Sequence, residues 1–239
     1  MHIIEIYKSL QGESSFAGLP CVFVRLAGCN LRCSWCDSEF TFSGGLRMNE
    51  DEIVEMVQKL SPVDAPRVAN NGPHVGHPTL VEITGGEPML QERELIPLME
   101  RLLKLGYELL LETSGERSLE QVPAAVHKIV DVKCPASGEH ERFRAENLLT
   151  LTGGDELKFV LASREDYEYA RRFVGERLAS CPAQIIFSPA FRKDATERSA
   201  ESCQLDPREL AEWMLADGIQ ARLGLQIHKF IWEPQLKGV

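Results

Sequence analysis

Short apolar runs alternate with amphipathic stretches along the chain, and this alternation determines the expected fold. Apolar residues three or four positions apart predict helices, whereas short apolar runs that end in a polar turn predict buried strands. Strands separated by helices in this way predict an α/β fold with a mostly parallel sheet and right-handed crossovers. Six or seven strands are expected, over residues 20–27, 79–84, 107–112, 128–133, 156–162, 184–187 and 222–227.

Several helix boundaries are marked by capping residues. Asn49, with Glu52 three positions later, predicts a helix start with a capping box. The helix over residues 91–105 is expected to stop at Gly106, and Pro97 inside it predicts a kink or a later start. Further helices are expected from Ser163 to about Leu178 and from Asp206 to near Gly218, with a loop over residues 61–78.

Length and composition indicate a single-domain enzyme of the cytosol. The 239 residues contain no repeat or long linker, so we expect one domain over residues 1–239. The net charge of −10 argues against broad nucleic-acid binding and favours a small-molecule substrate. No apolar stretch is long enough for a bilayer, and the N-terminus lacks signal-peptide features. Seven sparse cysteines, an odd number, favour the reducing cytoplasm over a disulfide framework.

Three cysteines form the most informative motif of the chain. Cys29, Cys33 and Cys36 follow the first expected strand at C-x3-C-x2-C spacing. Iron–sulfur clusters and structural zinc both usually take four ligands, so three thiolates leave one position open. Three thiolates at this spacing can hold three corners of a 4Fe-4S cluster. The open iron can then bind an amine and a carboxylate, which the methionine end of S-adenosylmethionine offers.

A zinc site is the alternative interpretation of this loop. Zinc needs a fourth ligand or a second C-x2-C pair, and the remaining cysteines form no pair. Cys21 lies inside a strand and is expected to be a small core residue. The ligand pattern therefore favours the cluster. No function is assigned to Cys134, Cys181 and Cys203.

Polar motifs follow several of the expected strands. The carboxyl ends of parallel strands meet at one edge of a sheet, where ligands bind. In Gly85-Gly86-Glu87-Pro88 the paired glycines allow close backbone approach, and Glu87 can accept a hydrogen bond from an ammonium. The Ser114 hydroxyl suits the carboxylate or ribose of S-adenosylmethionine. Lys133 and the Gln226-Ile227-His228 segment also fall at strand ends.

Arg25 lies within an otherwise apolar strand, where a charge is costly unless it is paired. A guanidinium matches a carboxylate bidentately, so an anionic substrate is the favoured partner. A structural ion pair, for example with Glu13, is the alternative.

The C-x3-C-x2-C loop resembles that of the radical S-adenosylmethionine superfamily. Six further segments make the resemblance narrower, because together they are similar to the 7-carboxy-7-deazaguanine synthase family. They are Leu10-Gln11-Gly12-Glu13, Arg25-Leu26-Ala27-Gly28-Cys29, Trp35-Cys36-Asp37-Ser38, Thr84-Gly85-Gly86-Glu87-Pro88, Glu112-Thr113-Ser114-Gly115 and Gln226-Ile227-His228-Lys229, with the cluster loop spanning residues 28–38.

The resemblance implies an open partial (β/α) barrel with a radical S-adenosylmethionine core, usually a homodimer. It implies a carbon–nitrogen lyase of queuosine and deazapurine biosynthesis. Such a lyase turns 6-carboxy-5,6,7,8-tetrahydropterin into 7-carboxy-7-deazaguanine with loss of ammonia. The cofactors implied are a 4Fe-4S cluster, S-adenosylmethionine and Mg²⁺, and the electron donor is a protein such as flavodoxin.

The resemblance also implies roles for individual residues. Cys29, Cys33 and Cys36 match the cluster ligands, and Ser38 matches a magnesium ligand that keeps a hard oxygen donor. Substrate positions are matched by Leu10, Gln11, Gly12, Arg25 and Thr84. S-adenosylmethionine positions are matched by Trp35, Cys36, Asp37, Gly86, Glu87, Ser114, Asp131, Val132 and Lys133.

Two departures from the family pattern stand out. Ser14 occupies a position where many relatives carry glycine, so the loop backbone is expected to differ there. Asp131-Val132-Lys133 replaces a commoner Ser-Pro-Lys, so the serine's contact is either lost or supplied by Asp131.

Two other functions remain open from the sequence. The first is a different radical enzyme, such as an activase that makes a glycyl radical in a partner protein. The second is a non-catalytic metal-binding or redox-sensing module, which would not cleave S-adenosylmethionine.

Overall fold

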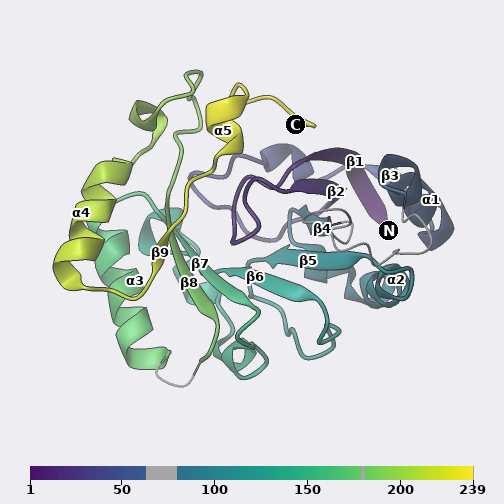
Figure 1. Ribbon diagram of the computed structural model, residues 1–239, viewed down its shortest axis with the longest axis horizontal. Helices are drawn as coiled ribbons and strands as arrows, with labels where there is room; N and C mark the ends of the chain where they lie inside the picture. Colours follow the sequence, from purple (N-terminus) through teal and green to yellow (C-terminus); the bar gives the residue numbers. More distant parts are fainter. Residues whose placement is uncertain (63–79, 179–180, 239) are drawn as a thin grey trace, which may run out of the picture.

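The computed structural model describes residues 1–62, 80–178 and 181–238. Within them, a single nine-stranded sheet curves through the molecule (Figure 1). Its order is β3 (Leu46–Arg47), β1 (His2–Leu10), β2 (Pro20–Leu26), β4 (Leu80–Gly85), β5 (Glu108–Thr113), β6 (His127–Asp131), β7 (Glu156–Leu161), β8 (Gln184–Pro189) and β9 (Arg222–Leu223).

Strand β2 and strands β4 to β9 run parallel to one another, which confirms the α/β fold with a mostly parallel sheet. At one edge, β1 pairs antiparallel with β2, and β3 pairs antiparallel with β1. In the part of the chain that the structure describes, β3 and β9 are the two edges of the sheet. The barrel is therefore open, as expected.

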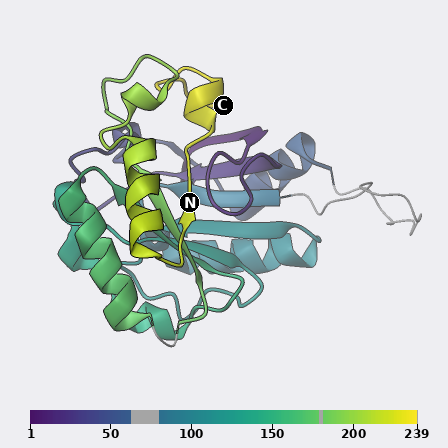
Figure 2. The ribbon, with the colours of Figure 1, turned by 60° about the vertical axis from the view of Figure 1, so that its left-hand side comes forward.

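Helices cover the outside of this curved sheet (Figures 1 and 2). In Figure 2, α3 and α4 lie side by side, and the Tyr167 hydroxyl of α3 donates a hydrogen bond to the Trp213 carbonyl of α4 at 3.0 Å. The α-helices are α1 (Glu50–Leu60), α2 (Glu92–Lys104), α3 (Arg164–Arg177), α4 (Pro207–Asp217) and α5 (His228–Ile231). Short 3-10 helices are η1 (Glu39–Thr41), η2 (Pro88–Gln91), η3 (Pro135–Ser137), η4 (His140–Arg142), η5 (Ala145–Leu149) and η6 (Ala200–Ser202).

The predicted caps of α1 and α2 are confirmed. The Asn49 side chain accepts a hydrogen bond from the Glu52 amide at 3.0 Å, and Glu52 accepts one from the Asn49 amide at 2.7 Å. Helix α2 ends before Gly106, whose φ of +91° favours glycine. Pro97 does not delay the start of α2, which begins at Glu92.

Three predictions about the sheet were wrong. Strand β1 was missed because its residues mix polar and apolar types, as suits a strand near the sheet edge. The last strand was expected over residues 222–227, but β9 ends at Leu223 and the chain then turns into α5. The short strand β3 was also missed. The predicted loop over residues 61–78 and the start of the strand at Thr79 lie almost wholly outside the described residues.

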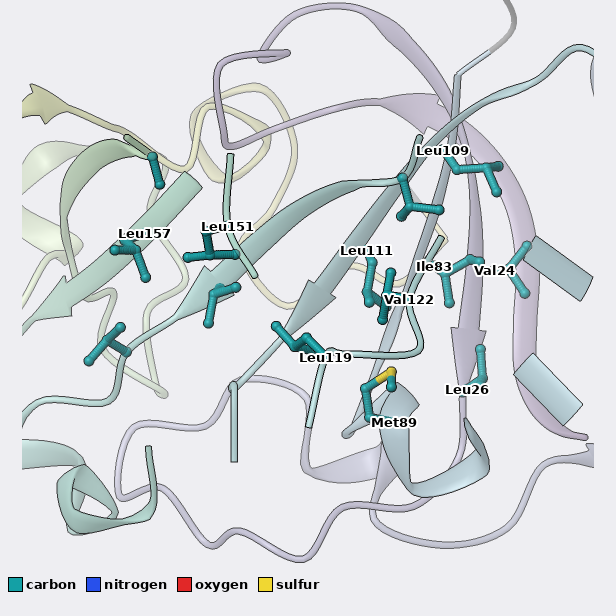
Figure 3. Packing of buried hydrophobic residues seen from close by; sticks show 14 of the residues in the cluster. Val24, Leu26, Ile83, Met89, Leu109, Leu111, Leu119, Val122, Leu151 and Leu157 are labelled. Carbon is teal, nitrogen blue, oxygen red and sulfur yellow. The ribbon is translucent and has the colours of Figure 1, made fainter. Parts of the chain in front are cut away.

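The main core lies between the sheet and the helices, and Figure 3 shows part of it. Alternate residues of β2, namely Val22, Val24 and Leu26, face this layer, as do Leu109 and Leu111 of β5. All five are essentially unexposed. Helix α2 packs onto them with the side chains of Leu95, Leu98, Met99 and Leu102.

A second apolar cluster closes the base of the barrel on the opposite face of the same strands. It consists of Cys21, Phe23, Leu80, Leu110 and Ile129, with Tyr7 and Phe16 packed against it. The core role predicted for Cys21 is thereby confirmed. Above this base the interior is lined by charged and polar side chains. None of the described helices has the length and apolar character needed to cross a membrane.

Candidate active site

A cavity of about 480 Å³ opens at the carboxyl ends of the strands, within the size range of ligand sites. It brings together nearly all the residues that the sequence singled out. Those on its wall are Leu10, Gln11, Gly12, Arg25, Cys29, Cys33, Trp35, Cys36, Asp37, Ser38, Thr84, Gly86, Ser114, Asp131 and Lys133. Glu87 and Val132 are the two predicted site residues that do not line it.

The cysteine loop is fixed to the wall of this cavity by backbone hydrogen bonds. The Gly28 amide donates to the Thr41 carbonyl at 2.7 Å, and the Ser34 amide donates to the Ser137 carbonyl at 3.0 Å. Arg32 Nη1 donates to the Cys29 carbonyl at 2.8 Å. These hydrogen bonds hold the loop against the cavity wall, and its three cysteines form no disulfide.

The arrangement of these thiols fits a cluster better than a single zinc ion. Ligands of one zinc ion, with bonds of about 2.3 Å, must lie within roughly 4.6 Å of each other. Among the described residues, no three His, Cys, Asp or Glu side chains are grouped to hold one metal ion. In a cubane cluster each thiolate binds a different iron, so three separated thiols around one cavity suit that larger group.

Gly86 allows the glycine-rich turn to lie against the cysteine loop. A Cβ at Gly86 would lie 2.1 Å from the Gly28 carbonyl oxygen, so only glycine fits there. The next residue, Glu87, donates its amide to the same oxygen at 2.8 Å. The turn and the cluster loop thus pack against each other as one unit.

The Glu87 side chain differs from the expectation. It is fully buried, and its carboxylate accepts hydrogen bonds from the Thr113 hydroxyl, the Ser114 amide and hydroxyl, and the Met89 amide, at 2.6–3.0 Å. These donors use the oxygens that were expected to accept a ligand ammonium. In this structure Glu87 joins the end of β4 to the end of β5, and the Ser114 hydroxyl serves that junction. Val132, also predicted at the site, is a core residue with no exposed surface.

Buried polar atoms without partners mark the part of the cavity beside the cysteines. Trp35 Nε1 and Asp131 Oδ1 are buried and have no hydrogen-bond partner among the described residues. Lys133 lies over the Trp35 ring at 5.0 Å, and its Nζ is 2.7 Å from Asp131 Oδ2. A ligand with both donors and acceptors fits this wall, and S-adenosylmethionine has both. Asp131 Oδ1 is therefore left without a protein partner beside Lys133.

Ser38 lies two residues beyond the last cysteine. Its hydroxyl is 3.7 Å from Cys36 Sγ, and its carbonyl accepts a hydrogen bond from the Thr41 hydroxyl at 2.7 Å. Ser38 is one of the residues that line the cavity.

Arg25 has protein partners, but they are not the predicted one. Arg25 Nε lies 2.8 Å from Glu5 Oε1, directly across from it on β1, and Nη2 donates to the Tyr7 hydroxyl at 2.6 Å. The alternative of a structural ion pair is therefore present, with Glu5 as the partner in place of Glu13. The Arg25 side chain keeps 19% of its surface exposed on the cavity wall, so the guanidinium still reaches the cavity.

Glu13 belongs to a different ionic cluster on the cavity floor. Lys158 Nζ lies 2.8 Å from Glu13 Oε2 and also contacts Glu112 Oε1. Burial alone would raise the pKa of Glu13, but Lys158 and His228 outweigh it and lower that pKa to about 2. Burial would lower the pKa of Lys158, yet Glu112 and Glu13 raise it well above its usual value. The pair is therefore charged at neutral pH.

The C-terminal segment holds the loop that follows β1 and the cluster loop together. Gln226 Nε2 donates to Glu13 at 2.8 Å, the Ile227 amide donates to the Gly12 carbonyl at 2.8 Å, and Lys229 pairs with Asp37. His228 packs so closely that a Cβ on Gly12 would lie 2.0 Å from His228 Nδ1. Gly12 is therefore required by this contact.

Ser14 keeps the backbone that glycine would give. Its φ is +59°, and it is the only non-glycine residue with positive φ in the described part of the chain. Serine here adopts the left-handed conformation, which favours glycine, at some cost.

Several cavity residues were missed by the sequence analysis. They are Glu5, Tyr7, Glu82 and Lys158, whereas Glu112, His228 and Lys229 were named only as parts of motifs, without a role. The available signal was a charge at an interior position of a buried parallel strand, as in Leu80-Val81-Glu82-Ile83. Such strands are normally almost continuously apolar, so each charge indicates a buried partner or a ligand.

Known proteins similar to the chain are consistent with this geometry. No family model matches the chain. The 7-carboxy-7-deazaguanine synthase of Koribacter versatilis is 59% identical over 241 residues, covering 100% of both chains. The protein of the same name from Chlorobaculum tepidum is 40% identical, covering 100% of this chain and 97% of that one. The crystal structure of QueE from Escherichia coli shares the fold, with a TM-score of 0.67 at 21% identity over 94% of this chain and 92% of that one.

Proposed function

The chain belongs to the 7-carboxy-7-deazaguanine synthase family, and from that premise we propose that it converts 6-carboxy-5,6,7,8-tetrahydropterin into 7-carboxy-7-deazaguanine with loss of ammonia. It acts as a carbon–nitrogen lyase of queuosine and deazapurine biosynthesis. The observation that carries this proposal is a single cavity that joins three free cysteines to a charged floor.

The cofactors are a 4Fe-4S cluster and S-adenosylmethionine. Cys29, Cys33 and Cys36 hold the cluster, leaving one iron open. When bound, the two cofactors together supply radical chemistry that begins with hydrogen-atom abstraction from the substrate. The adjoining wall holds S-adenosylmethionine through Trp35, Asp37, Gly86, Ser114, Asp131 and Lys133.

The protein's part in the reaction is to orient the substrate and exclude water. Arg25 orients the substrate carboxylate, and Leu10, Gln11, Gly12 and Thr84 complete the substrate wall. Thr84 donates its hydroxyl to Glu112 at 3.0 Å, which keeps that carboxylate aimed into the cavity. Burial lowers the pKa of His228, so its imidazole is neutral beside Glu13 and can accept or donate a hydrogen bond.

Mg²⁺ is the third cofactor, bound by the Ser38 hydroxyl and by substrate oxygens. The position of Ser38 on the cavity wall, with its hydroxyl 3.7 Å from Cys36 Sγ, supports this role. The enzyme works as a cytoplasmic homodimer, reduced by a flavodoxin-like donor. Val132 and Glu87 support the S-adenosylmethionine wall from the core, Val132 by packing and Glu87 through the hydrogen bonds of its carboxylate to Ser114.

Product analysis tests the proposal. The anaerobically reconstituted protein is treated with a chemical reductant in the presence of S-adenosylmethionine, Mg²⁺ and 6-carboxytetrahydropterin. The products are then identified by mass spectrometry. We expect 7-carboxy-7-deazaguanine and ammonia in equal amounts. A reconstituted protein that cleaves S-adenosylmethionine but leaves the pterin unchanged would favour a different radical enzyme, such as an activase. A protein that cleaves neither would favour the non-catalytic module.

A further inference from the structure

The cavity floor holds more carboxyl groups than cations. Glu13, Glu82 and Glu112 line it together with Lys158. Lys158 pairs with Glu13 and Glu112, and no ion pair joins it to Glu82. Arg25, on the next strand, is paired with Glu5. Among the described residues, Glu82 is thus the one carboxyl of this cluster without a counter-ion.

One oxygen of Glu82 is already used by the protein. Gln11 Nε2 donates to Glu82 Oε2. The orientation of the Gln11 amide is fixed, because its oxygen accepts the Glu13 backbone N–H at 2.6 Å. A flipped amide would set two donors against each other. Glu82 Oε1 accepts no hydrogen bond from the described residues. Because Glu82 lines the cavity, this oxygen is available to a ligand there.

The surroundings of Glu82 disfavour its ionised form. The residue is 3% exposed, and an unpaired buried carboxylate is costly. Burial raises the pKa of Glu82, and the nearby charges of Glu112 and Glu13 raise it further, well above its usual value.

The other charged or titratable groups that face Glu82 do not reverse this balance. Lys158 and Arg25 oppose the rise, but both are engaged by other carboxylates. The Cys21 thiol and the Tyr7 hydroxyl, which also face this floor, have pKa values raised by burial and stay neutral.

We infer that Glu82 contacts the substrate as a neutral carboxylic acid, donating a hydrogen bond to a carbonyl oxygen or ring nitrogen of the heterocycle. This inference rests on the proposed function, which makes a pterin the ligand. The floor then offers two kinds of group: Glu13 and Glu112 accept hydrogen bonds, while Glu82 donates one. A heterocycle with N–H groups beside a carbonyl satisfies both kinds.

A binding titration without turnover tests this role. The reconstituted protein with S-adenosylmethionine, but no reductant, is titrated with 6-carboxypterin at pH 6.5 and at higher pH. Glu82→Gln keeps a neutral donor and the acceptor for Gln11, whereas Glu82→Val removes both. Glu55→Gln, an exposed change on α1, is the control. Comparing variants at each pH cancels the titration of the ligand itself.

At pH 6.5 we expect Glu82→Gln and Glu55→Gln to bind within about threefold of the wild type. Glu82→Val should bind about tenfold more weakly, the loss of roughly one hydrogen bond. As the pH rises, wild-type binding should weaken relative to Glu82→Gln, because only Glu82 loses its proton. Binding by Glu82→Gln about tenfold weaker than wild type would overturn the inference, as would wild-type binding that tightens with pH relative to Glu82→Gln. Either result would indicate an ionised acceptor. If the wild type itself does not bind 6-carboxypterin, the proposed function fails instead.

Discussion

On the helix-covered face of the sheet, alternate residues of β2 and β5 are aliphatic and fully buried, as in Val24 and Leu111. On the cavity face, their immediate neighbours Arg25 and Glu112 are charged and line the site. One strand therefore serves two environments, because successive side chains point to opposite faces. The comparison teaches that stability and chemistry are separated here by the side of the sheet, rather than by the region of the chain.

The largest effect should come from the cavity-facing cysteines. Changing Cys29, Cys33 or Cys36 to Ala should abolish 5′-deoxyadenosine formation and lower bound iron and sulfide, because two thiolates cannot hold the cluster. Cys203→Ala is the matched control, since Cys203 is buried among Phe191, Ala195 and Phe230. One zinc ion and no sulfide in the wild type would contradict the cluster assignment.

Arg25→Ala should weaken substrate binding and also lower the stability of the fold. The Michaelis constant for the carboxypterin should rise far more than that for S-adenosylmethionine. Loss of a buried bidentate contact commonly costs about 2–5 kcal/mol. The melting temperature should also fall, because Glu5 loses its partner. Glu5→Gln is the control that breaks the protein ion pair alone. A lower melting temperature with an unchanged substrate constant would reject the substrate role of Arg25.

The ion pair of Glu13 on the cavity face should also make the free energy of unfolding depend on pH. The pKa of Glu13 is lowered in the folded protein, so its ion pair stabilises the fold above pH 4.5 and loses that effect as the pH falls toward about 2. Glu13→Gln should therefore flatten the fall in unfolding free energy between these pH values, by on the order of 2 kcal/mol. Leu98→Ala, on the helix-covered face, should lower the whole curve without changing its slope. Equal slopes in Glu13→Gln and wild type would disprove the ionic role of Glu13.

Ser38→Ala should have the smallest effect, a few-fold weakening of the response of turnover to Mg²⁺. Magnesium uses few protein oxygens and relies on substrate oxygens, so one hydroxyl matters moderately. Ser34→Ala, in the same loop with its hydroxyl bonded to the Ala136 carbonyl at 2.5 Å, is the control. An unchanged magnesium dependence in Ser38→Ala would remove Ser38 from the metal site.

The helix-covered face was largely predictable from the sequence. Apolar periodicity located the parallel strands β2 and β4–β8, and capping residues such as Asn49 located helix starts. These features depend on neighbours a few residues apart. Strand β1 was missed because its stability comes from pairing with β2, which local periodicity does not show.

The residues of the cavity face could be predicted only where they belong to a sequence motif. The cysteines and glycines were found by their spacing. The partners of Arg25 and Glu13 were not, because Glu5 and Lys158 come from strands far apart in the sequence. Glu87 was misjudged for the same reason, because three of its four donors come from Thr113 and Ser114, at the end of β5 and just beyond it, and only the fold brings them to its carboxylate.

The separation of the two faces is tested most directly by two adjacent residues of β5. Turnover per folded molecule is measured for Leu111→Ala and Glu112→Gln at a temperature where both variants are folded. Leu111→Ala, although it should lose about 2–5 kcal/mol of unfolding free energy, is expected to keep turnover near the wild-type value. Glu112→Gln is expected to stay nearly as stable but to lose most of its turnover. Equal loss of turnover in the two variants would contradict the account.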